Sequence, residues 1–338
     1  MTVLLLVLFA IFQLASADFE SWYNRYSKHM TMYMVSKEES SKAYAENVKY
    51  INDFNSGNHS YTLSEEGRWT GFPRSKLNII FPKRVHRRSV TDRDGINSGC
   101  YSNYHNGKND IFSKIIKDDN VKKTLKTIPT SVDWRSQMSS VRDQGSCGSC
   151  YAHGSVGALE GRLNIAYNNK FDLSEQQVVD CSKEYGNNGC GGGTGEQVYN
   201  YLLQNGLSYE YDYPYKGTTG TCKSTTRHVY LKTYTCGLGS MQEHLVNGPV
   251  DIAMDVEGSF MYYSSGYYDG NSDNCQNEFD ELNHEMVAVG YGYNNGRLYY
   301  IVRNSWGSSW GLNGYVYVYD NVCGVSLDPE VPLTFDLH

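Results

Sequence analysis

The sequence predicts an α+β protein with a helical amino-terminal segment in front of a larger domain. Apolar and aromatic side chains recur at helical spacing from Phe19 to Asn55, which predicts two helices. A second helical pattern covers roughly Ser149 to Tyr167. Strand-like runs follow at Val287–Tyr293, Leu298–Val302 and Tyr315–Tyr319. A helix-rich part followed by a strand-rich part is typical of the α+β class.

The composition is that of an ordinary globular protein. The chain has 338 residues, of which 40% are hydrophobic and 20% charged, and it has no internal repeat. It can therefore form one large domain or two medium ones.

Residues 1–17 are expected to be a cleaved secretory signal. Leu4–Phe12 is almost wholly apolar but too short to span a bilayer, and Ala15-Ser16-Ala17 has the small-x-small pattern of a cleavage site. A buried helix at the amino end is the alternative. No later stretch predicts a membrane anchor, so we expect a protein of the secretory pathway that acts in a lysosome, in another acidic vesicle or outside the cell.

Charge divides the chain near residue 127. Residues 1–127 carry a net charge of +6, and residues 128–338 carry −13. Such halves attract one another at neutral pH, and the attraction fades as carboxylates protonate in acid. The split suits a prosegment over residues 18–127 that masks a mature domain over residues 128–338. Two differently charged domains without that relation are the alternative, and no nucleic-acid partner is expected.

The prosegment is expected to have a helical inhibitory part, residues 18–81, and an exposed basic linker, residues 82–127. The basic run Arg84–Arg88 is either a cleavage point for a protease specific for basic residues or a solvated charge cluster. Asn58-His59-Ser60 is an acceptor pattern for glycosylation of Asn58.

Nine cysteines in a secreted chain predict a disulfide framework with at least one thiol left over. The stretch from Gln144 to Ala152 places Cys150 in the first turn of the second predicted helix. Unpaired backbone N–H groups and the helix dipole favour a thiolate there. Gly154 and Gly157 would let this helix pack closely. Its expected apolar stripe consists of Ala152, Val156, Leu159 and Leu163.

Three other side chains supply what a cysteine nucleophile needs. His284 precedes an apolar strand-like run, from which an imidazole can face a cleft and act as a base. Asn304 can accept a hydrogen bond from one imidazole nitrogen, while Trp306 shields that bond from water. The side-chain N–H of Gln144 can join the backbone N–H of Cys150 in an oxyanion hole.

Together these motifs resemble the signatures of the papain family of cysteine peptidases, nearest its cathepsin-L-like branch. The motifs are Gln144–Ala152, Asn283-His284, Asn304-Ser305-Trp306-Gly307 and Trp310-Gly311, and the likeness covers about Ile128 to Pro332. Amoebic members similarly have a Tyr after the nucleophile, as here at Tyr151.

The resemblance implies a two-lobed fold behind a helical inhibitory prosegment. A helix-rich lobe would carry Cys150, and a strand-rich lobe would carry His284 and Asn304. The implied activity is that of a cysteine endopeptidase that forms an acyl-enzyme and is made as an inactive zymogen. It implies no cofactor or metal. The implied partners are protein and peptide substrates, the protein's own prosegment and cystatin-like inhibitors, bound by a monomer.

The family pattern also implies disulfides. The implied pairs are Cys147–Cys190, Cys181–Cys222 and Cys275–Cys323, although six cysteines allow fifteen connectivities. Cys100 and Cys236 could pair with each other, but two free thiols are the simpler expectation.

The front half resembles the family's inhibitory prosegment only in part. Tyr44, Asn47, Ile51 and Asn55 fit the second half of its long helix motif. However, Ser36 and Ser40 stand where Glu and Arg are expected, and the short motif around Thr62 to Trp69 is degraded.

A substrate-binding set follows from the same resemblance. Gly192 and Gly193 belong to a glycine segment whose backbone would pair with an extended substrate. The pocket for the substrate side chain two residues upstream of the cleaved bond would involve Asp328, whose carboxylate should favour Arg as well as hydrophobic residues. A surface turn at Asp328 is the alternative. The same pocket would include Thr194 and the apolar residues Ala253 and Leu282, and Asn283 and Trp306 complete the substrate-binding set.

Two residues near the expected nucleophile depart from the family pattern: Tyr151 replaces Trp and His153 replaces Phe. His153 is interpreted as a hydrogen-bonded core histidine rather than a second titrating group in catalysis.

Competing functions remain. A thiol-disulfide oxidoreductase would use Cys147 and Cys150 as a redox pair, but this leaves Gln144, His284 and Asn304 unexplained. A zinc module lacks a second close pair of ligands. A catalytically silent binding protein on the same fold would normally lack one active-site residue type, and an exopeptidase would carry a His-containing insertion that is missing here.

Overall fold

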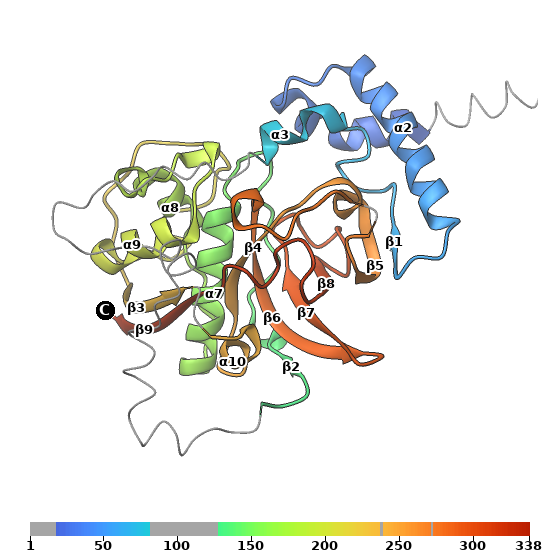
Figure 1. Ribbon diagram of the computed structural model, residues 1–338. Helices are drawn as coiled ribbons and strands as arrows, with labels where there is room; N and C mark the ends of the chain where they lie inside the picture. The colour runs from blue at the N-terminus through green and yellow to red at the C-terminus, as the bar shows by residue number, and fades with distance from the viewer. Residues whose placement is uncertain (1–17, 82–127, 237–238, 272) are drawn as a thin grey trace, which may run out of the picture.

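A computed structural model describes residues 18–81, 128–236, 239–271 and 273–338 (Figure 1). The predicted signal, the basic linker and Cys100 lie outside these residues. The amino-terminal segment, residues 18–81, contains a helix over residues 18–32, α2 (Lys37–Asn55), β1 (Tyr61–Leu63), η1 (Arg74–Lys76) and α3 (Leu77–Ile80). The two helices predicted between Phe19 and Asn55 are confirmed.

Helix α2 begins after Ser36, which forms a capping box with Glu39. The Ser36 hydroxyl accepts from the backbone N–H of Glu39, and the Glu39 carboxylate accepts from the backbone N–H of Ser36. Ser40, found where Arg was expected, is fully buried. A Cβ added at Gly71 would lie under 3.0 Å from the Trp22 ring and the Ser40 hydroxyl. The two small residues therefore allow this close approach, which leaves no room for a long side chain.

The helix-rich lobe packs around the long helix that starts at the expected nucleophile. It contains α7 (Cys150–Tyr167), α8 (Glu175–Cys181), η3 (Lys183–Tyr185), η4 (Gly189–Gly191) and α9 (Gly195–Asn205). Leu159, Leu163, Val178 and Leu202 belong to one buried cluster in this lobe.

The strand-rich lobe supplies most of the sheet. The remaining elements are β2 (Val132–Asp133), η2 (Arg135–Gln137), β3 (Val229–Cys236), α10 (Met241–Leu245), β4 (Val250–Met254), η5 (Gly258–Tyr262), β5 (Tyr263–Tyr268), η6 (Phe279–Glu281), β6 (His284–Asn294), β7 (Arg297–Arg303), β8 (Tyr315–Tyr319) and β9 (Glu330–Leu337). The three predicted strand runs are β6, β7 and β8. The strand order is β1-β5-β8-β7-β6-β4-β9-β3, and β2 pairs with β6.

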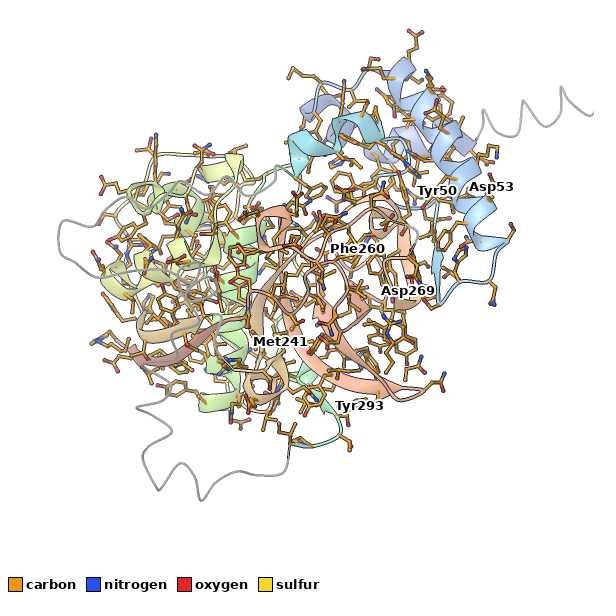
Figure 2. All side chains as sticks on the ribbon, in the orientation of Figure 1. Tyr50, Asp53, Met241, Phe260, Asp269 and Tyr293 are labelled. Carbon is orange, nitrogen blue, oxygen red and sulfur yellow. A yellow bond between two sulfur atoms is a disulfide. The ribbon has the colours of Figure 1, made fainter. Side chains whose placement is uncertain are left out.

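The amino-terminal segment adds a strand to the sheet of the strand-rich lobe and packs against its core. Strand β1 pairs antiparallel with β5, and residues of both parts form a single buried cluster. The ring centres of Tyr50 on α2 and Tyr262 are 6.4 Å apart. Figure 2 labels Tyr50 in the amino-terminal segment and Phe260 in the strand-rich lobe that it contacts. The segment therefore shares a hydrophobic core with the lobe that it covers.

Helix α7 lies between α8 and α9 on one side and strands β4 and β6 on the other (Figure 1). A Cβ at Gly154 would lie under 3.0 Å from the Asp251 carboxylate of β4, and one at Gly157 would lie 3.1 Å from Val287 of β6. The predicted close packing is thus present. The predicted apolar stripe was too narrow, because polar residues such as Glu160 and Asn164 on α7 are buried as well.

The three implied disulfides, Cys147–Cys190, Cys181–Cys222 and Cys275–Cys323, are present. Cys236 is also disulfide-bonded. The expectation of a free thiol at Cys236 was therefore wrong. An odd number of cysteines shows that at least one thiol is unpaired, but it does not identify which one. Among the described residues, no helix is both long enough and apolar enough to cross a bilayer.

Candidate active site

Cys150 is the first residue of α7 and is a partly exposed thiol. The loop before it is held by two contacts to the segment around Cys190: the Cys147–Cys190 disulfide and a 3.0 Å hydrogen bond from Gly148 N to Cys190 O. A thiolate at this position would meet the first-turn N–H groups and the positive end of the helix dipole.

His284 begins β6, and its buried side chain contacts the loop after β7. Its Nε2 lies 2.9 Å from Asn304 Oδ1. Because an amide oxygen only accepts, Nε2 carries the proton and Nδ1 is the basic nitrogen. His284 Nδ1 has no hydrogen-bond partner among the described residues. Asn304 Oδ1 also accepts from Ser305 N at 2.8 Å, which fixes the amide orientation.

Gln144 is buried and held at both ends of its side-chain amide. Ser305 Oγ donates to Gln144 Oε1 at 2.6 Å, and Gln144 Nε2 donates to Cys147 O at 2.9 Å. Its backbone N–H donates to Ser305 O at 2.8 Å. Nε2 therefore keeps one further N–H for an oxyanion. Ser305 lies within a motif that the sequence singled out, but its role as an anchor of Gln144 was not predicted.

Aromatic rings cover His284. The ring centres of Trp306 and of Phe81, from the amino-terminal segment, lie 4.9 Å and 5.4 Å from that of His284. Burial lowers the pKa of His284 to about 4, and the hydrogen bond with Asn304 opposes this shift. The imidazole is thus neutral at pH 7 while Phe81 lies over it.

Arg68 is a second contact from the amino-terminal segment. Its guanidinium donates to both carboxylate oxygens of Asp143, next to Gln144, and donates to Trp306 O at 2.9 Å. Burial raises the pKa of Asp143, but the hydrogen bonds and charge of Arg68 outweigh burial and hold it below its ordinary value. One side chain therefore connects the loops that carry Gln144 and Trp306.

The expected substrate-binding residues lie in both lobes. Gly192 has a φ of 103°, and Thr194 caps α9 by accepting from Gln197 N. A Cβ at Gly193 would lie under 3.0 Å from Asn187 Oδ1. Asn283 accepts from Val256 N at 2.8 Å.

Ala253 and Leu282 form a small buried cluster with Phe279. Phe279 was missed because its neighbours in the sequence are polar. Asp328 is 2% exposed, so the alternative of a surface turn was wrong.

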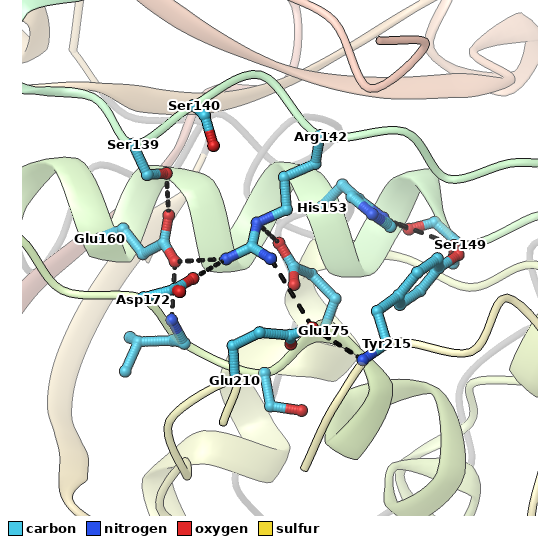
Figure 3. A network of polar contacts seen from close by, with 12 residues as sticks. Ser139, Ser140, Arg142, Ser149, His153, Glu160, Asp172, Glu175, Glu210 and Tyr215 are labelled. Carbon is cyan, nitrogen blue, oxygen red and sulfur yellow. Dashed lines mark hydrogen bonds and ion pairs between the residues drawn. The ribbon is translucent and has the colours of Figure 1, made fainter. Parts of the chain in front are cut away.

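Arg142, two residues before Gln144, is a cation surrounded by carboxylates (Figure 3). Arg142 Nε lies 3.0 Å from Glu175 Oε1, and its guanidinium also contacts Glu160, Asp172 and Glu210. Burial raises the pKa of Glu175 well above its ordinary value, although Arg142 opposes the shift. No sequence motif points to this network, because its members are distant along the chain.

His153 and Tyr215 complete the surroundings of Cys150. His153 Nδ1 donates to Ser149 O at 2.9 Å, so the interpretation as a hydrogen-bonded core histidine is confirmed. Burial lowers its pKa to about 4. Tyr215 OH lies 2.7 Å from Ser149 Oγ and donates to Gln144 O at 2.8 Å. Tyr215 was missed, since it is one of 30 tyrosines and lies far from the motifs in sequence.

Three buried carboxyl groups lie together at the start of α9. Asp251 and Glu330 are partners across β4 and β9, and Gly195 N donates to Glu285 Oε1 at 3.0 Å. Tyr199 OH lies 3.3 Å from Asp251 Oδ2. Burial, then Asp251, Glu330 and Glu285, raise the pKa of Tyr199 well above its ordinary value. Glu285 directly follows His284 in β6, where successive side chains point to opposite faces of the sheet.

Comparisons with known proteins agree with this geometry. Residues 128–333 match the family model described as papain family cysteine protease. "Cysteine proteinase 2" of Entamoeba histolytica is 34% identical over 333 residues, covering 94% of this chain and 95% of that protein. The "Cathepsin L-like proteinase" of Fasciola hepatica is 40% identical over 220 residues, covering 62% of this chain and 66% of that protein.

Solved precursor structures are also similar. Digestive procathepsin L 3 of the Tenebrio molitor larval midgut has a TM-score of 0.73 at 25% identity, covering 93% of this chain and 99% of that chain. A recombinant stem bromelain precursor has a TM-score of 0.69 at 27% identity, covering 92% of this chain and 98% of that chain.

Proposed function

Because this chain belongs to the papain family of cysteine proteases, we propose that it is a cysteine endopeptidase with Cys150 as nucleophile and His284 as base. The observation that carries the assignment is the 2.9 Å hydrogen bond from His284 to Asn304. It directs the protonated Nε2 toward the amide, so that Nδ1 can exchange a proton with the Cys150 thiol.

In the first half of the reaction the Cys150 thiolate attacks the peptide carbonyl carbon. The oxygen becomes negatively charged and is stabilised by the remaining Gln144 Nε2–H and the backbone N–H of Cys150. The C–N bond then breaks as His284 Nδ1–H protonates the leaving amine, which leaves an acyl-enzyme on Cys150.

In the second half His284 Nδ1 takes a proton from water, whose oxygen attacks the thioester. The same donors stabilise the second oxyanion. The C–S bond breaks, the carboxylic acid leaves and the Cys150 thiolate returns. Trp306, whose ring centre lies 4.9 Å from that of His284, is proposed to shield the His284–Asn304 bond from water.

The amino-terminal segment is proposed to inhibit the enzyme until it is cleaved off near Ile128. Phe81 covers His284, and Arg68 connects Asp143 to Trp306. Residues 1–17 are proposed as the secretory signal, and an acidic vesicle or the cell exterior as the place of action. Asn58 is exposed, as its proposed glycosylation requires. The proposed partners are protein substrates and cystatin-like inhibitors, bound by a monomer.

The enzyme is further proposed to accept Arg as well as hydrophobic residues two positions upstream of the cleaved bond. Asp328 is buried, and Ala253 and Leu282, the expected apolar walls of the same pocket, are fully buried. A buried carboxylate is stabilised when a substrate cation lies beside it.

The test is hydrolysis of two fluorogenic dipeptides, one with Arg and one with Leu at the upstream position, by the acid-matured protein. We expect Cys150→Ala to lose at least about a thousandfold in kcat. Retained activity in Cys150→Ala would assign the chemistry to another residue. No activity in either protein would favour a silent binding protein on the same fold.

The redox alternative is disfavoured by the disulfide pattern. Cys147 is bonded to Cys190 and lies outside the helix that begins at Cys150. A thiol-disulfide oxidoreductase that used Cys147 and Cys150 as a pair would first have to break this bond.

A further inference from the structure

The hydroxyl of Tyr215 joins the two backbone segments that carry the proposed oxyanion hole. It donates to Gln144 O at 2.8 Å. It also lies 2.7 Å from the Oγ atom of Ser149, the residue before Cys150 (Figure 3). Tyr215 itself is held by a 2.7 Å hydrogen bond from its backbone N–H to Glu210, a member of the Arg142 network. The hydroxyl is therefore fixed relative to both segments.

The direction of each hydrogen bond follows from the atoms involved. A carbonyl oxygen only accepts, so the single proton of the Tyr215 hydroxyl goes to Gln144 O. Ser149 must then donate its own proton to the Tyr215 oxygen. Ser149 is fully buried, and its carbonyl accepts from His153 Nδ1, so both ends of the residue are held.

Because its hydroxyl bonds to Tyr215, the Ser149 side chain does not cap helix α7. Ser149 is the N-cap residue of α7, where a serine side chain ordinarily accepts from a backbone N–H two or three residues on. Its side chain makes no such bond here. The Ala152 N–H donates to the Ser149 carbonyl oxygen at 3.0 Å, and the Ser149 hydroxyl takes none of the first-turn N–H groups.

We infer that Tyr215 is a positioning residue for the peptidase reaction, which fixes Gln144 and keeps the Ser149 hydroxyl away from the first turn of α7. The inference rests on the proposed role of Cys150. It assigns Tyr215 no contact with substrate.

The primary test is Tyr215→Phe in the matured enzyme, which keeps the ring and removes the hydroxyl. We expect kcat to fall about three- to tenfold, the effect of one or two hydrogen bonds, with KM changed less than about twofold. The pH profile for alkylation of Cys150 by iodoacetamide should move to higher pH, because the Ser149 hydroxyl now competes for the first-turn N–H groups.

Two further variants separate positioning from general stability. Ser149→Ala introduced into Tyr215→Phe should restore the alkylation profile, because the competing hydroxyl is gone. The matched control is Tyr213→Phe, whose hydroxyl bonds to Asp180 away from the site and whose loss should leave kcat and the profile unchanged.

Three results would overturn the inference: an unchanged kcat in Tyr215→Phe, a loss confined to KM, or an alkylation profile that Ser149→Ala does not restore. Ser149→Ala alone is a test that does not depend on the Phe variant. It leaves the Tyr215–Gln144 bond in place, so a loss as large as tenfold would also contradict the inference. Retained activity in Cys150→Ala would instead reject the proposed function.

Discussion

At the scale of single residues, Asp328 determines the proposed substrate preference. Asp328→Ala should lower kcat/KM for the Arg dipeptide about tenfold or more, because the buried carboxylate that stabilises the cation is removed. Hydrolysis of the Leu dipeptide should change little. An unchanged Arg to Leu ratio would place Asp328 outside the pocket, and Asp336, which is exposed, supplies the matched Asp→Ala control.

His284 shows how the precursor can keep its own chemistry switched off. Its pKa is lowered to about 4 by burial, and Phe81 contributes one of the covering rings. A charged thiolate–imidazolium pair is therefore disfavoured while the prosegment is docked. When Phe81 leaves, the imidazole gains contact with water and its pKa rises toward the ordinary value.

At the scale of elements, helix α7 depends on its close approach to the sheet. Gly154→Ala should destabilise the protein by about 1–3 kcal/mol, because the added Cβ would lie under 3.0 Å from the buried Asp251 carboxylate. Part of this cost, up to about 1 kcal/mol, is offset by the higher helix propensity of Ala. Denaturant unfolding of the Cys150→Ala precursor measures the effect.

Gly157→Ala is the matched control on the same helix. Its added Cβ would meet the Val287 and Arg303 side chains at 3.1 Å and 3.2 Å, which can yield slightly. We expect Gly157→Ala to lower the free energy of unfolding less than Gly154→Ala does. Equal losses would show that the rigidity of the side chains facing the added Cβ does not determine the destabilisation.

The elements that could be predicted are those whose pattern is local. Helix α7 begins within a residue of the prediction, and β8 matches Tyr315–Tyr319 at both ends. Strand β1, only three residues long, has no readable pattern of its own. It forms because β5 offers it a partner.

The same contrast applies to the candidate site. Cys150, His284, Asn304 and Gln144 are found in motifs, and the structure brings the last three together through Ser305 and the His284–Asn304 bond. Tyr215 and the Arg142 network escaped prediction because their roles depend on contacts between distant segments. A tyrosine or an arginine in a polar loop carries no signal of such contacts.

At the scale of the whole molecule, His29 is predicted to make prosegment docking sensitive to acid. It lies in the helix over residues 18–32, 5.0 Å from the ring of Trp69, which in turn lies 5.3 Å from Trp306. Its Nε2 is buried without a hydrogen-bond partner. Burial, and then the like charge of Arg68, lower its pKa to about 3, while Asp143 opposes the shift. Tyr33 and Phe72 are the other rings around it.

The sign follows from linkage. The docked histidine stays neutral down to about pH 3, whereas a released one takes up a proton below about pH 6.5. Docking is therefore strongest above about pH 6.5. As the pH falls from about 6.5 toward 3, docking weakens by up to about tenfold per pH unit. His29→Phe should mature at the wild-type rate at pH 7.5 and at least about tenfold more slowly at pH 4.5.

The measurement is the rate at which each precursor gains dipeptide-hydrolysing activity, expressed as a wild-type to variant ratio at each pH. His59→Phe is the control, because this exposed histidine stacks on Phe54 within the segment. A ratio for His29→Phe that is the same at both pH values would exclude His29 as an acid sensor.

The pairing of β1 with β5 has a consequence for the protein after maturation. Release of the prosegment would strip β1 from the sheet and turn β5 into an outermost strand with bare N–H and C=O groups at Ser265 and Gly266. Such an edge is a template for strand addition by another molecule. The net charge of −13 on residues 128–338 opposes that self-association at neutral pH. Acid, which is proposed to free the enzyme, also removes part of this repulsion, so newly matured molecules would be most prone to self-association in an acidic compartment.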